Sequence, residues 1–272
     1  MTGRFPIERI EARILDIPTI RPHKLSFGAI SRQSPVIVQL WLAGGACGFG
    51  EAATIGGPSW NEESPESILH AIQSHLAPAL LGQDGARFGA VLARMDLACK
   101  GNAFAKSAVE MALVDAVARS LDLPAWQLLG GKCHQSLPLA WTLASGDIGR
   151  DLEEAQLRLE QRRHRIFKMK IGARTPEQDV AHVTQIARGL EGRATLTVDV
   201  NQAWDGATAR RHLPALVNAG VTLIEQPVAS DALILRDGAL IGTFQGVNAA
   251  TGPTGSRITY CWIGGSVGTM RP

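Results

Sequence analysis

Residues 165–172 read RIFKMKIG, a short apolar run that is interrupted by two lysines. Successive side chains of a strand point to opposite faces, so Lys168 and Lys170 share one face while Phe167 and Met169 share the other. Two ammonium groups held side by side repel each other unless anions lie close to them. The pattern therefore predicts a strand with one buried apolar face and one charged face, and it predicts carboxylates near the two lysines.

The next segments of the chain supply these anions. RATLTVDVNQAWD (193–205) and GVTLIEQPV (220–228) both read as strands with polar ends, which carry Asp199 and Asn201 in the first and Glu225 in the second. Helical patterns separate the strands, which recur roughly every 26–29 residues, as is typical of parallel strands joined by crossover helices. Functional groups gather at the carboxyl ends of such strands, so we expect these side chains to meet at one edge.

The part of the chain before residue 136 is organised differently. It has strand patterns first (7–17, 34–45 and 45–57) and helical patterns second (64–79, 86–99 and 105–120). Strands followed by helices indicate an α+β unit, whereas alternating strands and helices indicate an α/β unit. We therefore expect an α+β domain over residues 1–135, four βα units over 136–228, and an atypical tail over 229–272.

Composition excludes several classes of protein. The net charge of +2 over 272 residues favours neither nucleic acid nor an anionic membrane as a partner. The four cysteines are scattered without a CxxC spacing, which favours reduced thiols over disulfides or a zinc site. Residues 1–17 carry acids and bases throughout, and no apolar run is long enough to span a bilayer. We expect a cytoplasmic protein that binds no nucleic acid and no membrane.

The lysines and carboxylates suit metal-assisted proton transfer. Carboxylate oxygens are hard ligands that suit Mg²⁺ or Mn²⁺, and a divalent ion held by Asp199 and Glu225 would stabilise an oxyanion on a bound carboxylate. A lysine beside this ion and beside a second ammonium should have a lowered pKa, and it could then move a proton at the adjacent carbon. The alternative is that the four side chains form structural ion pairs only.

Several motifs resemble those of a known family. KMKIG, VDVNQAWD and IEQPV resemble the lysine motif and the first two metal-ligand motifs of the enolase superfamily. AWTLASGD and KGNAFAKS resemble its muconate- and chloromuconate-lactonizing subgroup, and the resemblance runs from residue 7 to Val228. It implies an α+β capping domain with substrate-covering loops over residues 1–135. The first four βα units of a TIM-like barrel would follow over 136–228, so that the barrel is incomplete in this chain.

The resemblance also implies an activity. It is the reversible, Mn²⁺- or Mg²⁺-assisted lactonisation of cis,cis-muconate to muconolactone, a step of catechol degradation in the β-ketoadipate pathway, carried out by a homo-oligomer. Lys170 would deliver the proton with help from Lys168, and Asp199 and Glu225 would bind the metal. The residues implied to bind the dicarboxylate substrate are Ile55, Gly56, Thr142 and Asn201. Without the resemblance, the loop at 55–57 is equally well a tight turn.

The resemblance ends after Val228. The family would continue with four further strands, a third metal-binding carboxylate and another lysine, but residues 229–272 contain no glutamate and no lysine. We expect a C-terminally truncated or frame-shifted relative whose third metal ligand is absent, which would weaken metal binding. Three alternatives stay open: a chloromuconate cycloisomerase, to which GGPSW is similar; another member of the superfamily, such as a dipeptide epimerase; and a non-catalytic remnant that needs a partner.

Overall fold

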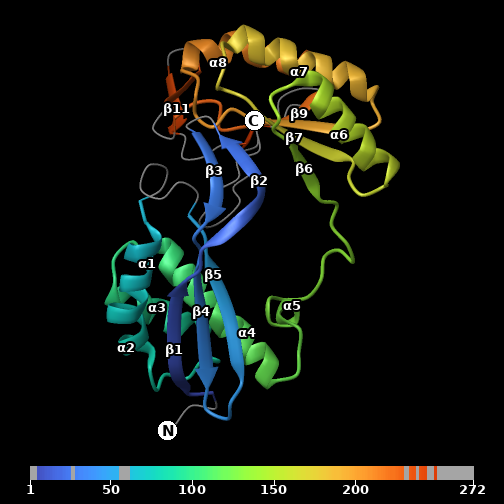
Figure 1. Cartoon of the computed structure of the whole chain (residues 1–272). Coiled ribbons are helices and arrows are strands. Elements are labelled where there is room, and N and C mark those ends of the chain that lie inside the picture. Colours follow the sequence, from blue (N-terminus) through green and yellow to red (C-terminus); the bar gives the residue numbers. More distant parts are fainter. Residues whose placement is uncertain are drawn as a thin grey trace. The chain divides into compact units, whose positions relative to one another are not determined.

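The computed structural model describes residues 5–25, 28–54, 62–229, 233–236, 239–243 and 248–249. They divide into two units (Figure 1). The first unit ends at Gln135 and the second begins at Ser136, except that residues 23–29 group with the second. Each unit has its own hydrophobic core. The predicted division into residues 1–135, 136–228 and 229–272 stays a prediction.

The first unit is built on an antiparallel sheet with the strand order β1-β4-β5. Its strands are β1 (Ile7–Ile14), β4 (Val36–Leu42) and β5 (Cys47–Ala52). The strand pattern over 34–45 is confirmed by β4, in which every second side chain is buried. The long helix α4 (Ala103–Ser120) packs against β4 and β5.

Two glycines of β5 bring α4 unusually close to the sheet. A Cβ atom added at Gly48 would lie 2.1 Å from the carbonyl oxygen of Ala112, and one added at Gly50 would lie 1.9 Å from that of Ala108. The glycines therefore serve close packing rather than phosphate binding. The helical pattern over 105–120 is confirmed by α4, whose buried residues include Val109, Leu113, Ala116 and Val117.

The remaining helices of this unit are short. They are α1 (Pro65–Ala71), the π-helical segment η2 (Ile72–Leu76), α2 (Ala77–Leu80), α3 (Phe88–Ala98) and α5 (Ala125–Leu128). The sequence predicts one regular helix over 64–79, but the run changes to π-helix before Pro78, which has no backbone N–H to donate. The sequence did not predict the two-stranded sheet of β2 (Ile17–Leu25) and β3 (Gly28–Gln33).

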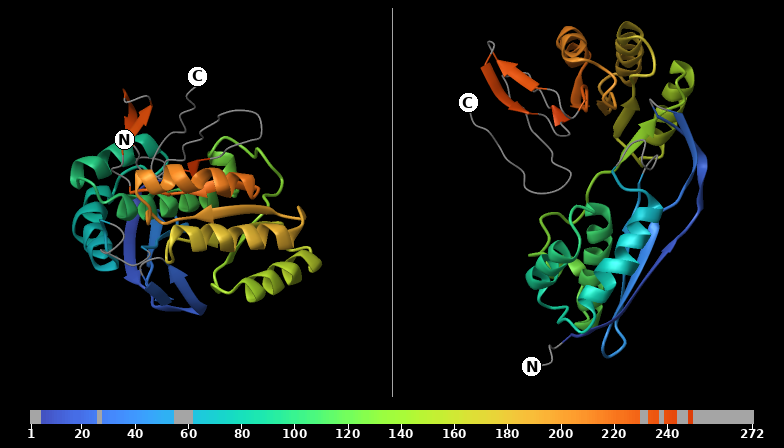
Figure 2. Two further views of the ribbon diagram at one scale, coloured as in Figure 1. Left: turned by 90° about the horizontal axis from the view of Figure 1, so that it is seen from above. Right: turned by 90° about the vertical axis from the view of Figure 1, so that its left-hand side faces the viewer.

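The second unit contains the predicted parallel sheet. Its parallel strands are β6 (Ala140–Leu143), β7 (Ile166–Lys170), β8 (Thr195–Asp199) and β9 (Val221–Glu225), in this order. Helices α6 (Ile148–Glu160), α7 (Pro176–Leu190) and α8 (Gly206–Asn218) lie over one face of the sheet, with α7 between the other two (Figures 1 and 2). The α/β prediction is thus confirmed, and the opposite face of the sheet is left for the charged residues.

Each of the three helices begins at a side-chain cap. The side chains of Asp147, Thr175 and Asp205 accept hydrogen bonds from the backbone N–H three residues later. Such caps satisfy backbone donors that the first turn of a helix leaves free. They fix where each crossover helix starts, and so they set the length of the loop that follows each strand.

The described part of the tail does not continue this pattern. Strands β10 (Leu233–Arg236) and β11 (Ala239–Thr243) pair antiparallel with each other, and β12 (Asn248–Ala249) pairs antiparallel with β9. In the ranges that the structure describes, no helix is long and apolar enough to cross a membrane.

Candidate active site

Lys168 and Lys170 lie on β7, and their nearest anions come from the next two strands. Strand register places Lys170 beside Asp199 at the end of β8, and Asp199 beside Glu225 at the end of β9. Phe167 and Met169 are fully buried on the helix-facing side of β7. The structure thus brings together the lysines and carboxylates that the sequence singled out, on the sheet face away from the helices.

Asp199 is the centre of this cluster. Its Oδ2 atom lies 2.7 Å from Lys170 Nζ and 3.0 Å from Lys168 Nζ, and its side chain is only 2% exposed. Lys168 also donates to Glu225 Oε2, so it bridges the two carboxylates. Lys170 instead donates to Asn201 Oδ1 at 3.2 Å. The two lysines share one carboxylate but differ in their second partner.

The backbone at the ends of β8 and β9 is unusual. Asn201, Gln202 and Gln226 all have positive φ, with values of 50°, 64° and 42°. Residues other than glycine adopt this conformation rarely, and it is common at functional sites. Here it lets the Asn201 N–H donate to Asp199 Oδ1 at 3.0 Å, so that both oxygens of the buried carboxylate have partners.

The charges in the cluster shift each other's protonation. Burial alone would raise the pKa of the Asp199 carboxyl, but the charge and hydrogen bond of Lys170, and then those of Lys168, outweigh it and lower the pKa. Burial alone would lower the pKa of Lys168, but its bonds to Glu225 and Asp199 outweigh it and raise the pKa. The raised pKa of Lys168 arises from its two carboxylate neighbours, and the lowered pKa expected of a lysine beside a bound metal ion stays a prediction.

The structure places the predicted substrate-binding residues less completely. Thr142 is the strand neighbour of Lys168 in β6, and Asn201 contacts Lys170, so both lie at the cluster. Ile55 and Gly56 lie outside the residues that the structure describes. The roles proposed for these four residues stay predictions.

The donor atoms of the cluster fit a divalent metal ion. Two carboxylates from adjacent strands converge on one cationic atom, Lys168 Nζ, which shows that they create a place for positive charge. Mg²⁺ commonly binds through one or two carboxylates and keeps several water ligands. Within the described part of the chain, no group of three or more His, Cys, Asp or Glu residues is placed to hold a metal. The assignment of Asp199 and Glu225 as metal ligands stays a prediction.

Two acids that lie behind this cluster were not predicted from the sequence. Asp151 in α6 and Asp179 in α7 are 1% and 3% exposed, although their sequence context is that of ordinary helix surface. Each lies in the first turns of a helix and contacts a residue just after a strand. That placement, an acid in the first turns of the crossover helix in two consecutive units, is the sequence signal that could have found them.

Models of protein families match both units. The model of the mandelate racemase / muconate lactonizing enzyme N-terminal domain matches residues 9–130, and that of the enolase C-terminal domain-like family matches residues 150–243. The chain belongs to the mandelate racemase and muconate lactonizing enzyme family. The second match continues past Val228, where the motif resemblance ended, into the β10–β11 hairpin.

Individual members of the family are similar to the chain over most of its length. Muconate cycloisomerase 1 of Pseudomonas putida is 50% identical over 82% of this chain and 60% of its own, and a chloromuconate cycloisomerase of Cupriavidus necator is 48% identical with the same coverage. The crystal structure of a Pseudomonas fluorescens muconate lactonizing enzyme complexed with muconolactone superposes with a TM-score of 0.81 at 48% identity, covering 83% of this chain and 61% of that one. The chain thus spans about three fifths of the length of these relatives.

Proposed function

We propose that this chain carries out the metal-assisted cycloisomerisation of cis,cis-muconate to muconolactone, the reaction for which its relatives are named. The observation that carries the proposal is the cluster of Lys168, Lys170, Asp199 and Glu225 at three adjacent strand ends. Members of the enolase superfamily use a divalent metal ion. We propose Mn²⁺ or Mg²⁺ for this chain, because both prefer carboxylate oxygens.

The charge balance of the cluster suits a dicarboxylate. The two lysines and two carboxylates cancel, so the cluster is close to neutral by itself. A bound divalent ion would add two positive charges, which matches the two negative charges of muconate. Such an ion stabilises negative charge that develops on carboxylate oxygens of the substrate.

Lys170 is the proposed proton donor. In lactonisation an oxygen of one substrate carboxylate forms a C–O bond to the double bond that is conjugated with the other carboxylate, and the electron pair of that double bond moves to the carbon next to this other carboxylate. The Lys170 ammonium then gives its proton to this carbon, so that the dianion and one proton become the lactone monoanion. In the reverse direction the neutral amine removes the same proton, as a general base does.

Lys168, Thr142 and Asn201 have supporting roles in this proposal. Lys168 contacts both carboxylates, which keeps it charged and close to any anion bound there. The side-chain oxygen of Asn201 accepts a hydrogen bond from Lys170. Thr142, on β6, is the strand neighbour of Lys168 on β7, and its hydroxyl suits a substrate oxygen. Ile55 and Gly56 are proposed, as in the family, to cover the substrate.

The test is the loss of muconate ultraviolet absorbance when purified protein and Mn²⁺ are added. Lys170→Ala should lower the rate at least about 100-fold, as expected when a general acid–base residue is lost. Lys106→Ala is the matched control, because Lys106 has the same 17% side-chain exposure and also a 2.7 Å ion pair, in its case with Asp96. Equal turnover in wild type and Lys170→Ala would overturn the role of Lys170.

Chlorinated muconates are a second candidate substrate class, because chloromuconate cycloisomerases match this chain about as well as muconate cycloisomerases do. The same assay with 2-chloromuconate decides between them through the ratio of the kcat/KM values. If soluble, folded protein turns over neither substrate and Mn²⁺ does not raise its Tm, the non-catalytic alternative is correct.

We also propose that the protein is a cytoplasmic homo-oligomer. The small net charge and the lack of a long apolar run in the sequence support the cytoplasmic location. Three large apolar side chains that are each about 70% exposed support the assembly into oligomers: Leu129, Leu137 and Leu139. Light scattering of the purified chain would test the assembly, and a monomer mass would contradict it.

A further inference from the structure

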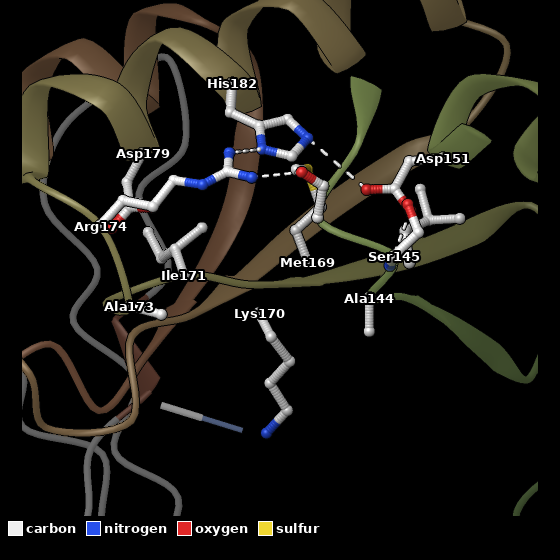
Figure 3. Close-up of a pocket in the computed structure, with 12 residues that line it drawn as sticks. Ala144, Ser145, Asp151, Met169, Lys170, Ile171, Ala173, Arg174, Asp179 and His182 are labelled. Atoms are coloured by element: carbon white, nitrogen blue, oxygen red, sulfur yellow. Dashed lines mark hydrogen bonds and ion pairs between the residues drawn. The ribbon is translucent and has the colours of Figure 1, made fainter. Parts of the chain in front are cut away.

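A second polar cluster lies on the opposite side of β7 from the lysines. It borders a cavity of about 240 Å³ at the ends of β6 and β7 and the starts of α6 and α7 (Figure 3). The side chains of Asp151, Arg174 and His182 face one another there, whereas Lys170 points away from them (Figure 3). The proposed reaction does not use this cluster.

Asp151 ties helix α6 to the loop that follows β6. Its Oδ1 atom accepts hydrogen bonds from the backbone N–H of Ser145 at 3.0 Å and from the Ser145 hydroxyl at 2.7 Å. Ser145 comes two residues after the last residue of β6. Burial would raise the pKa of the Asp151 carboxyl, but hydrogen bonds with His182 and Ser145 outweigh it and lower the pKa, which keeps the acceptor charged.

His182 and Arg174 connect this loop to the one that follows β7. Arg174 Nη1 lies 2.7 Å from His182 Nδ1, and because a guanidinium only donates, Nδ1 must accept and the proton must lie on Nε2. His182 Nε2 faces Asp151 Oδ2 at 3.5 Å. The other end of the guanidinium donates to the Gly146 carbonyl. The contacts form a closed circuit between the two loops.

A separate contact holds the loop immediately after Lys170. Asp179 Oδ2 accepts from the Gly172 N–H at 2.7 Å, two residues beyond Lys170. Gly172 has φ of 101°, and a Cβ there would lie 2.5 Å from the Val200 carbonyl oxygen. The loop after β7 is therefore packed against the β8–α8 loop and hydrogen-bonded to α7. Because the segment between Arg174 and Lys170 is short and held on both sides, a displacement of Arg174 is transmitted to Lys170.

We infer that Asp151, His182 and Arg174 are positioning residues that fix the strand ends carrying Thr142 and Lys170. They do not touch the lysine, and they act through the backbone of the two loops. The role of Lys170 in this inference rests on the proposed function. In the third βα unit the comparable bond is made within the site itself, from the Asn201 N–H to Asp199. The circuit is thus confined to the two strands whose ends carry no carboxylate.

The experiment compares Arg174→Ala with two matched variants of the full chain. Arg174 is exposed, so its truncation should leave the fold intact. Arg174→Lys keeps a donor for the Gly146 carbonyl. It should therefore differ less from wild type than Arg174→Ala does. Ile186→Ala in α7 is the stability control, because the Ile186 side chain is fully buried in the core and is not a member of the circuit.

Two quantities are measured in each variant. The first is the rate at which an amine-reactive ester labels Lys170, read by peptide mass spectrometry with Lys106 as internal reference. Arg174→Ala should raise it about threefold, because a loosened loop exposes the lysine more often. The second is turnover of muconate, in which kcat should fall about tenfold with a smaller change in KM, because small displacements of reacting groups are costly.

The outcomes separate this inference from the proposed function. Unchanged labelling of Lys170 in Arg174→Ala overturns the positioning role, and so does an equal change in Ile186→Ala. If wild type shows no turnover, the proposed function fails, but the labelling comparison still decides whether the circuit holds Lys170.

Discussion

On one face of β7, Lys168 and Lys170 contact the charged oxygens of Asp199 and Glu225, and three of these four side chains are between 17% and 26% exposed. On the other face, Asp151 is 1% exposed, and its closest partners are the N–H and O–H of Ser145. The first face pairs charge with charge around one buried carboxylate, Asp199, and its other three side chains are partly open to solvent. The second satisfies a buried charge mainly with neutral donors.

This difference separates groups that can exchange partners from groups that cannot. An ion pair open to solvent can be remade with a substrate or a metal at little cost, because water is at hand during the exchange. A buried carboxylate that loses a hydrogen-bond donor keeps the full cost of its desolvation. The chain thus places its adaptable charges on the open face and its fixed ones under the helices.

The largest expected effect lies on the helix-facing side. Phe167 is completely buried between the sheet and the helices, so Phe167→Ala should lower the free energy of unfolding by about 3–5 kcal/mol. Thr197→Ala on the neighbouring strand removes only a weak 3.4 Å hydrogen bond to the Phe167 carbonyl and should cost less than about 1 kcal/mol. Urea unfolding measures both. Equal losses would show that the two faces are not packed differently.

Asp199→Asn should have the next largest effect. It leaves two lysine side chains beside a neutral amide, and breaking a largely buried ion pair on one side costs about 3 kcal/mol. Glu225→Gln should cost less than half of this, because Glu225 is more exposed and pairs with one lysine only. Urea unfolding without added metal makes the comparison. A larger loss for Glu225→Gln would contradict the central place of Asp199.

Asp151→Asn should reduce the acid sensitivity of the fold. The pKa of Asp151 is lowered in the folded protein, so its stabilisation is complete above the unfolded value of about 3.9 and is lost as the pH falls through the folded pKa. The variant should be about 1 kcal/mol less stable than wild type at pH 6, and this gap should close below about pH 4. The opposite shift of Asp179, whose pKa burial raises, is present in both proteins and cancels. If the stability difference between the variant and wild type instead widened as the pH falls, the pKa of Asp151 would be raised in the folded protein and not lowered.

The smallest effect is expected on the outer surface of the helices. Glu177 Oε1 lies 3.3 Å from His212 Nε2, but the Glu177 side chain is 68% exposed. Glu177→Gln should change the free energy of unfolding by less than about 0.5 kcal/mol, since exposed ion pairs contribute little. A loss comparable to that of Asp151→Asn would show that exposure does not separate these acids.

Much of the charged face could be predicted because it depends on local patterns. The alternation in residues 166–171 decides which side chains share a face, and the repeat of strand and helix brings Lys170, Asp199 and Glu225 into register. The apolar spacing of α4 likewise predicts its buried stripe. In each case one periodicity determines the result.

The circuit behind the site could not be predicted in the same way. Whether Arg174 reaches the Gly146 carbonyl depends on the conformation of two loops and on the rotamer of a long side chain, neither of which leaves a period in the sequence. The raised pKa of Lys168 depends on the exact number of carboxylates that it contacts. The π-helical segment before Pro78 and the sheet of β2 and β3 were likewise not predicted from the sequence.

The glycines of β5 have a consequence for how the first unit can vary. Every nucleotide change in a glycine codon that alters the residue adds at least a Cβ atom, and at positions 48 and 50 that atom would overlap a backbone oxygen of α4. Backbone cannot move aside as a flexible side chain can, so the helix and the sheet would have to separate along their whole contact. These two codons should therefore be among the least variable of the unit, although neither encodes a side chain.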